Sequence, residues 1–278
     1  MAKRKLSKQQ QRRIANQQQD MIKDIELQLD ESSSQTARVI SHHGRELYAE
    51  GEGGLKIKCK IRQNIGDIAC GDYVVIQKAT NKPSPADETS DFDSHHVVVA
   101  IKERTNLLLK TGFAGATKPV AANIDQLVIV TAIKPKPNPY LIDRYLCAAE
   151  NLPAKALIII NKTDLVDNEN KDLLDDVSDL YQGIGYRVII SSVKQDVGIN
   201  EIAQALSNNT SILVGLSGVG KSSIVKTILP KETIKIGDTS AATGEGRHTT
   251  TVSALYHLDN NGIIIDSPGV RDFRLEPT

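Results

Sequence analysis

Residues 215–223, GLSGVGKSS, have the glycine, lysine and serine spacing of a phosphate-binding loop. The glycines let backbone N–H groups wrap a phosphate chain, and a helix that begins there adds a favourable dipole. An apolar stretch, TSILV, precedes the loop and a helix-like stretch, SIVKTIL, follows it, which makes a chance glycine-rich turn a poor alternative. We expect Lys221 to reach the β- and γ-phosphates of a nucleoside triphosphate and the Ser222 hydroxyl to ligate Mg²⁺. The candidate loop residues are Gly215, Leu216, Ser217, Gly218, Val219, Gly220, Lys221, Ser222 and Ser223.

A second stretch, Asn161-Lys162-Thr163-Asp164, has the residue types of a guanine-binding pocket. The Asp164 carboxylate can accept two hydrogen bonds from the N1–H and N2 amino edge of guanine, an edge that adenine does not offer. Asn161 can reach the opposite side of the base while the Lys162 stem lies over its face. A polar strand-to-helix turn is the alternative, which the preceding buried strand makes weaker. The residues Ser191, Ser192 and Val193 end the next strand and could present backbone N–H groups to the guanine O6.

A third stretch, IIIDSPGV, could contact the metal and the γ-phosphate. Asp266 ends a buried strand and would hold Mg²⁺ through a water, while Gly269 would offer a backbone N–H to the γ-phosphate. In the segment GEGRHTTTVSAL, Thr250 or Thr251 would complete the Mg²⁺ shell. Taken singly, Asp-Ser-Pro-Gly would be better explained as a plain turn.

The elements that must position these residues alternate between apolar strands and amphipathic helices from residue 126 onward. Such alternation predicts an α/β fold with a mostly parallel, six-stranded sheet that is covered on both faces. The phosphate loop begins 51 residues after Asp164, whereas ordinary GTPases place it first. This order predicts a circular permutation, which a compact domain with neighbouring termini tolerates.

The region before this alternation predicts a small all-β barrel, because five or six short strands lie between residues 37 and 111. An OB-fold, whose open face and loops bind oligonucleotides, is the leading candidate. Residues 79–94 are expected to form a long loop. The predicted organisation is a basic disordered tail over 1–35, an OB-fold RNA-binding domain over 36–112, a linker over 113–124 and a circularly permuted P-loop GTPase domain over 125–278.

Composition indicates a cytoplasmic globular protein. Of the 278 residues, 40% are hydrophobic and 24% charged, and no apolar run approaches the roughly 20 residues needed to span a bilayer. Residues 1–13 contain six basic residues and no acidic one, so the tail could meet a polyanion such as RNA or stay solvated without a role. Cys59, Cys70 and Cys147 have no metal-site spacing and are expected to be core thiols.

The permuted order, the preceding barrel and the stretches GLSGVGKSS, GEGRHTTT and DSPGVRDF together resemble the ribosome small-subunit-dependent GTPase family known as RsgA, YjeQ or YloQ. The resemblance covers roughly residues 36–278. It implies an enzyme that docks on the small ribosomal subunit late in its assembly, contacts ribosomal RNA and hydrolyses GTP, with Mg²⁺, to GDP under stimulation by the subunit. A monomer is expected, since nothing in the sequence suggests otherwise.

Two features qualify this resemblance. Family members carry a C-terminal zinc-binding domain, but this chain ends nine residues after Gly269, so no zinc is expected here. Val270 stands where many GTPases have a glutamine that orients the attacking water, and an apolar side chain cannot do this. His248 in GRHTTT resembles the family's candidate for that catalytic role, beside Lys221.

Two alternatives to this enzyme remain open on the sequence. Val270 and the missing zinc domain would also suit an RNA-binding module whose nucleotide domain senses GTP or GDP with little hydrolysis. A less favoured alternative is a P-loop enzyme that uses ATP.

Overall fold

A computed structural model gives the fold of residues 34–43, 46–62, 65–78, 96–111, 117–229 and 253–267. The chain divides into two compact units. The first holds His43–Ile68, Asp72–Glu103 and the residues up to Val39, and the second holds Ile40–His42, Ala69–Gly71 and everything from Arg104 onward. The candidate nucleotide-binding residues all belong to the second unit.

Five strands of the first unit close into a barrel. They are β1 (Ser34–His43), β2 (Glu46–Glu50), β3 (Lys56–Ile61), β4 (Tyr73–Lys78) and β5 (His96–Ile101), with one 3₁₀ turn, η1 (Glu52–Gly54). Their order is β1-β2-β3-β5-β4, and β4 pairs back onto β1 to close the ring. Alternate residues such as Leu47, Ile57 and Val74 fill the interior. A closed five-stranded barrel of this kind is consistent with an OB-fold.

A largely parallel sheet forms the centre of the second unit. Its strands are β8 (Gln126–Ala132), β9 (Lys155–Asn161), β10 (Arg187–Ile190), β11 (Thr210–Val214), β12 (Ala254–His257) and β13 (Ile263–Asp266). They lie in the order β10-β9-β8-β11-β13-β12, and each neighbouring pair is parallel except β12 with β13. The carboxyl ends of β9, β10, β11 and β13 therefore meet at one edge of the sheet, where ligands of open α/β sheets bind.

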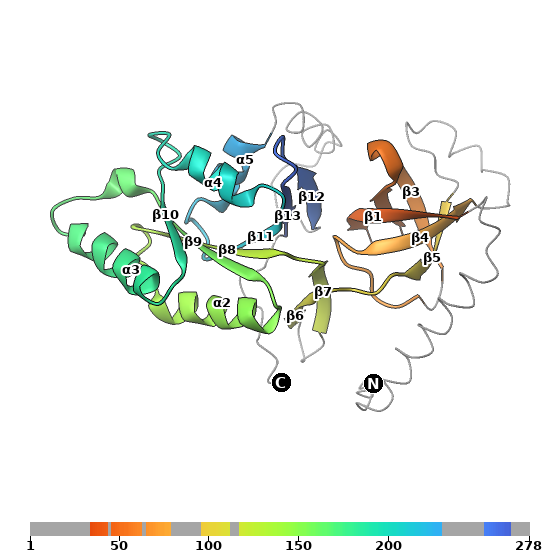
Figure 1. The fold of residues 1–278 in the computed structure, drawn as a ribbon, viewed down its shortest axis with the longest axis horizontal. Coiled ribbons are helices and arrows are strands. Elements are labelled where there is room, and N and C mark those ends of the chain that lie inside the picture. Colours follow the sequence, from red (N-terminus) through yellow and green to blue (C-terminus); the bar gives the residue numbers. More distant parts are fainter. Residues whose placement is uncertain are drawn as a thin grey trace. The chain divides into compact units, whose positions relative to one another are not determined.

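Helices cover both faces of this sheet. They are α2 (Pro139–Asn151), α3 (Lys171–Gly183), α4 (Ile199–Leu206) and α5 (Lys221–Ile228), with α2 and α3 on one face and α4 and α5 on the other (Figure 1). Successive side chains of β8 alternate between the two cores: Leu127 and Ile129 pack on the α2–α3 side, and Val128 and Val130 on the α4–α5 side. Burial on both faces explains why β8 is apolar without alternation in the sequence.

The structure departs from the sequence expectations in two places. Strands β6 (Leu107–Thr111) and β7 (Thr117–Ala122) pair in a separate two-stranded sheet, so the segment expected to be a linker contains a strand. Cys59 and Cys70 are buried, but Cys147 is exposed on α2, so the expectation of a core thiol is wrong there. The helix turns Cys147 away from the sheet while its neighbours Leu146 and Ala148 face the core.

The predicted loop over 79–94 lies outside the described residues. Among the described helices, none is long and apolar enough to cross a membrane.

The Asn106 side chain joins three segments of the second unit. Its Nδ2 donates to the Ile124 carbonyl at 2.7 Å and to the Leu152 carbonyl at 2.9 Å, and its Oδ1 accepts from the Ile124 N–H at 2.8 Å. These bonds tie the start of β6 to the turn before β8 and to the end of α2. One amide thus satisfies three backbone groups that would otherwise lack partners in a part-buried position.

We expect Asn106→Ala to lower the free energy of unfolding of the second unit by about 2–4 kcal/mol, because it removes three hydrogen bonds to backbone groups. Urea unfolding followed by the helical circular-dichroism signal measures this, since the described α-helices all belong to that unit. Asn151→Ala is the matched control: Asn151 is exposed at the end of α2, and a change within about 0.5 kcal/mol is expected. Equal stability of the two variants would contradict the role given to Asn106.

Candidate nucleotide-binding site

The phosphate loop connects β11 to α5 through three glycines with positive φ: Gly215 at 139°, Gly218 at 81° and Gly220 at 98°. These angles belong to conformations that side-chain-bearing residues rarely adopt. The Lys221 side chain folds back over the loop, and its Nζ donates to the carbonyls of Gly215 and Leu216, each at 2.7 Å. The ammonium is therefore held against the loop where a phosphate chain would lie.

The two base-binding segments are hydrogen-bonded to each other. The Ser192 hydroxyl donates to Asp164 Oδ1 at 2.7 Å, and the backbone N–H and hydroxyl of Thr163 both donate to the Ser191 carbonyl, at 3.2 and 3.1 Å. The motif turns sharply after β9, because Lys162 has a φ of 62° and the 3₁₀ turn η3 (Thr163–Leu165) follows. These contacts hold the Asp164 carboxylate in one orientation, and its other oxygen, Oδ2, forms an ion pair with Lys194.

The Asn161 side chain connects the base motif to the phosphate loop. Its Nδ2 donates to the Val219 carbonyl at 2.9 Å across 58 residues of sequence, and its Oδ1 accepts from the Ser191 hydroxyl at 3.3 Å. Only 2% of Asn161 is exposed. The sequence pattern predicts that this side chain contacts the base, and the bond to Val219 uses only one of the two Nδ2 hydrogens. Asn161 is thus a structural tie between three loops.

Gly220 lies directly against the Asn161 side chain. A Cβ built on Gly220 would overlap Asn161 Nδ2, and one built on Gly215 would overlap the carbonyl oxygen of Val130 on β8. Both glycines are therefore required by close approach as well as by their φ angles. The base motif can lie next to the phosphate loop because residue 220 has no side chain.

Asp266 ends β13 beside the phosphate loop. Burial raises the pKa of its carboxyl above the ordinary value, and the positive charge of Lys221 opposes this shift. The charge of a bound divalent cation would favour the ionised form of this carboxyl group. Asp266 and the Ser222 hydroxyl at the start of α5 offer the oxygen ligands that Mg²⁺ prefers. Phosphates and waters would supply the remaining ligands.

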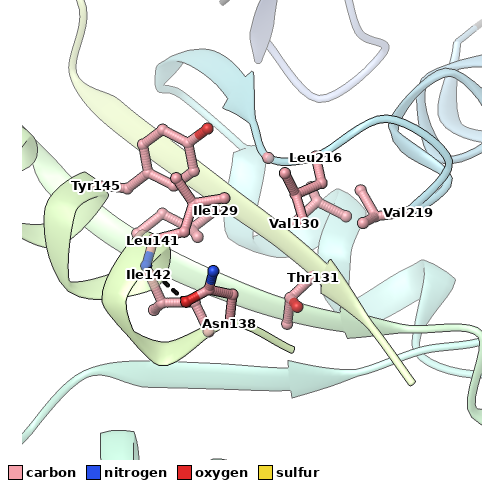
Figure 2. Close-up of a pocket in the computed structure, with 10 residues that line it drawn as sticks. Ile129, Val130, Thr131, Asn138, Leu141, Ile142, Tyr145, Leu216 and Val219 are labelled. Atoms are coloured by element: carbon pink, nitrogen blue, oxygen red, sulfur yellow. Dashed lines mark hydrogen bonds between the residues drawn. The ribbon is translucent and has the colours of Figure 1, made fainter. Parts of the chain in front are cut away.

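A small hollow lies under the phosphate loop (Figure 2). The end of β8, the first turns of α2 and the loop residues Gly215, Leu216 and Val219 line it. No charged side chain belongs to this lining. The close-up shows that α2 contributes Leu141 and Tyr145 to this lining and that the phosphate loop contributes Leu216.

Other predicted site residues lie outside the described part of the chain: His248, Thr250, Thr251 and Gly269. The structure adds two groups that the sequence motifs do not include. Lys194 Nζ lies 4.0 Å from Asp164 Oδ2, and the Lys134 carbonyl accepts a hydrogen bond from Lys162 Nζ at 3.3 Å. Lys194 directly follows Val193 and could have been found by extending the second base loop by one residue; nothing in the sequence around Lys134 indicates its contact.

The arrangement can bind a guanine nucleotide. A carboxylate fixed by a serine faces the base side, and a lysine, a glycine-rich turn and a helix N-terminus face the phosphate side. Asn161 makes the two halves one site, because it is bonded to both.

Comparison with known proteins agrees with this assignment. A family model described as RsgA GTPase matches residues 101–276. A protein of Hahella chejuensis named small ribosomal subunit biogenesis GTPase RsgA is 40% identical over 289 residues, which cover 99% of this chain and 80% of that protein. The protein of the same name from Yersinia enterocolitica is 41% identical over 281 residues, covering 99% and 79%.

Two solved structures resemble the fold. The crystal structure of YjeQ from Thermotoga maritima matches with a TM-score of 0.65 and 29% identity, covering 87% of this chain and 77% of that one. The crystal structure of YloQ, described as a circularly permuted GTPase, matches with a TM-score of 0.61 and 27% identity, covering 87% and 73%.

We expect Gly220→Ala to lower the free energy of unfolding by about 2–3 kcal/mol, because it strains a positive φ and displaces the Asn161 amide from the Val219 carbonyl. Urea unfolding measures the change. Gly183→Ala is the matched control, since an added Cβ meets nothing within 4 Å at the end of α3, and its stability should be unchanged or slightly higher. Two variants of equal stability would show that the loop tolerates a side chain against Asn161.

Proposed function

Because this chain belongs to the RsgA GTPase family, we propose that it hydrolyses GTP to time its release from the small ribosomal subunit late in assembly. The family expected from GLSGVGKSS, GEGRHTTT and DSPGVRDF is confirmed, and with it the assignment as a GTPase that acts in small-subunit maturation. The single structural observation that carries the proposal is the hydrogen bond from Asn161 to the Val219 carbonyl, which joins a guanine motif to a phosphate loop.

We further propose that the strands from β8 to β13 form the complete six-stranded sheet of a circularly permuted GTPase domain over residues 125–278. The parallel pairing of β8 with β11 supports this, because it places the base-binding strands and the phosphate-binding strand in one sheet despite the reversed motif order. The barrel formed by β1 to β5 would be the RNA-binding domain. The tail over residues 1–35 completes the proposed organisation.

Guanine recognition is assigned to Asp164 and the loop that orients it. With Oδ1 fixed by the Ser192 hydroxyl at 2.7 Å, the carboxylate can accept from the N1–H and N2 amino groups of guanine. Lys194 adds a positive charge 4.0 Å from the same carboxylate. Val193, at the end of the second base loop, would present its backbone N–H to the guanine O6.

For phosphate and metal, the assigned residues are those of the phosphate loop and Asp266. Lys221 would neutralise the β- and γ-phosphates, and Ser222 and Asp266 would hold Mg²⁺, with Thr250 or Thr251 completing the set. Magnesium would supply charge neutralisation between the phosphates. Asp266 suits this role because it ends β13, where the positive charge of Lys221 acts on its carboxyl group.

Hydrolysis needs a group that orients water, and we assign this role to His248. Val270 follows Gly269 and has no hydrogen-bonding side chain. Both His248 and Gly269 lie outside the described residues, so this assignment rests on the family alone.

Ribosomal RNA is the proposed partner of the barrel. Strand β3 carries Lys56, Lys58 and Lys60 at alternate positions, so their side chains share one face, and Lys56 and Lys60 are exposed. Tyr48 on β2 lies opposite Lys58 in the antiparallel ladder. Lys58 Nζ is paired with Glu46 at 3.0 Å, so Lys56 and Lys60 are the lysines that would meet a backbone phosphate, with Tyr48 for a stacked base. We also propose that the protein acts as a monomer in the cytoplasm, where small subunits are assembled.

We expect Asp164→Asn to exchange specificity from GTP to xanthosine triphosphate, whose base has an acceptor where guanine has its N2 amine. The affinity for GTP should fall at least about tenfold, since a bidentate pair discriminates by about 1–3 kcal/mol. Competition binding of GTP, xanthosine triphosphate and ATP measures this, with the exposed Asp172→Asn of α3 as the control. Unchanged GTP affinity, or binding of ATP instead, would indicate a pocket that does not recognise guanine.

We expect small ribosomal subunits to raise the GTP turnover of the chain at least about tenfold, because phosphoryl transfer depends on positioning that a partner can complete. Purified subunits, naked ribosomal RNA and ATP as the alternative substrate are the three arms. Stimulation by subunits alone supports the proposal. Tight GTP binding without stimulation would instead favour a nucleotide sensor.

The same assay tests His248. Replacing it by Ala should lower stimulated turnover by about 100-fold or more while GTP affinity stays unchanged, as for loss of a general base. The exposed His257 on β12 provides the control, as His257→Ala. Unchanged turnover in His248→Ala would remove this residue from the mechanism.

A further inference from the structure

Four carbonyls of the phosphate loop are already bonded within the protein. The Gly215 and Leu216 carbonyls accept from Lys221 Nζ, the Val219 carbonyl accepts from Asn161 and the Gly220 carbonyl accepts from the Ile224 N–H. Ser217 and Gly218 lie between these hydrogen-bonded residues and are exposed. Within the described ranges, no hydrogen bond is made by the Ser217 hydroxyl, which is therefore available to a ligand.

The position of Lys221 indicates which part of a nucleotide this hydroxyl would meet. Its ammonium, which binds β- and γ-phosphates in loops of this kind, touches the carbonyl of the residue immediately before Ser217. The start of α5, at Gly220 and Lys221, lies at the other end of the loop and would meet the phosphates nearer the ribose. Ser217 therefore stands on the γ-phosphate side.

The exposed part of the loop around Ser217 also has space for a ligand. A Cβ built on the neighbouring Gly218 meets no heavy atom within 4 Å, so the loop is open there. A serine hydroxyl that donates to a phosphate oxygen makes a charge-assisted hydrogen bond, which is about twice as strong as a neutral one. The bond forms only when the γ-phosphate is present.

We propose that the Ser217 hydroxyl donates a hydrogen bond to the γ-phosphate of GTP, which makes Ser217 a catalytic residue that also discriminates GTP from GDP. The inference rests on the proposed function and adds to it a residue whose side chain recognises the γ-phosphate. The bond stabilises the charge on the γ-phosphoryl oxygens as the bond to the leaving GDP breaks.

Three substitutions separate the hydroxyl from the bulk of the side chain. Ser217→Ala removes the hydroxyl, Ser217→Thr keeps it, and Ser217→Gly removes the whole side chain. Thr227→Ala on α5 is the matched control, because the Thr227 hydroxyl bonds only to the Ser223 carbonyl of its own helix among the described contacts. The measurements are the affinities for fluorescent GDP and for a non-hydrolysable GTP analogue, and the rate of single-turnover hydrolysis.

The expected result for Ser217→Ala is a loss of about tenfold in analogue affinity and in hydrolysis rate, with GDP affinity unchanged and Ser217→Thr close to the native chain. An equal loss for GDP and the analogue would overturn the inference, because it would mean a distorted loop. Faster hydrolysis in Ser217→Gly would also overturn it, by making the side chain an obstruction. If the unsubstituted chain bound neither nucleotide, the proposed function itself would fail, an outcome distinct from both.

Discussion

The hydrogen bond from Asn161 Nδ2 to the Val219 carbonyl is the contact on which the rest of the site depends. It is buried, so breaking it would leave an amide donor and a carbonyl acceptor without partners, which costs about 1–3 kcal/mol per group. Through its Oδ1, the same amide reaches Ser191 in the second base loop. The three loops therefore hold one another in place, and the phosphate side of the candidate site is fixed relative to its base side.

The sheet makes this contact possible by bringing distant segments together at one edge. Parallel pairing of β9 with β8, and of β8 with β11, places the ends of β9 and β11 on either side of β8. The loops that follow these strands then meet above β8, and Gly215 passes so close to the Val130 carbonyl that no side chain fits between them. Burial on both faces of β8 fixes its position, since α2 and α5 pack against opposite sides.

The sequence predicts the strands and helices well where one physical signal dominates. The apolar run of β8 and the helical spacing in α2 are visible without a structure, and the loop at 215–223 is specific because glycine, lysine and serine must stand at fixed positions. Contacts between loops are not visible in this way. The engagement of Asn161 with Val219 depends on tertiary approach, and the exposure of Cys147 depends on the angular position of one residue on a helix that is otherwise correctly predicted. Strand β7 contains Pro119, a residue disfavoured in strands, so a linker is the natural expectation from the sequence.

The order of the strands along the chain also has a consequence for biosynthesis. A polypeptide emerges from the ribosome with its N-terminal part first, and β8, α2, β9, α3 and β10 form a contiguous run that can pair before β11 exists. The nascent chain thus builds the base-recognising half with one edge of β8 still open. Strand β11 then pairs with that edge and brings the phosphate loop, and β13 follows with Asp266. Nucleotide binding is consequently a property that the chain acquires only after β11 and β13 have been synthesised.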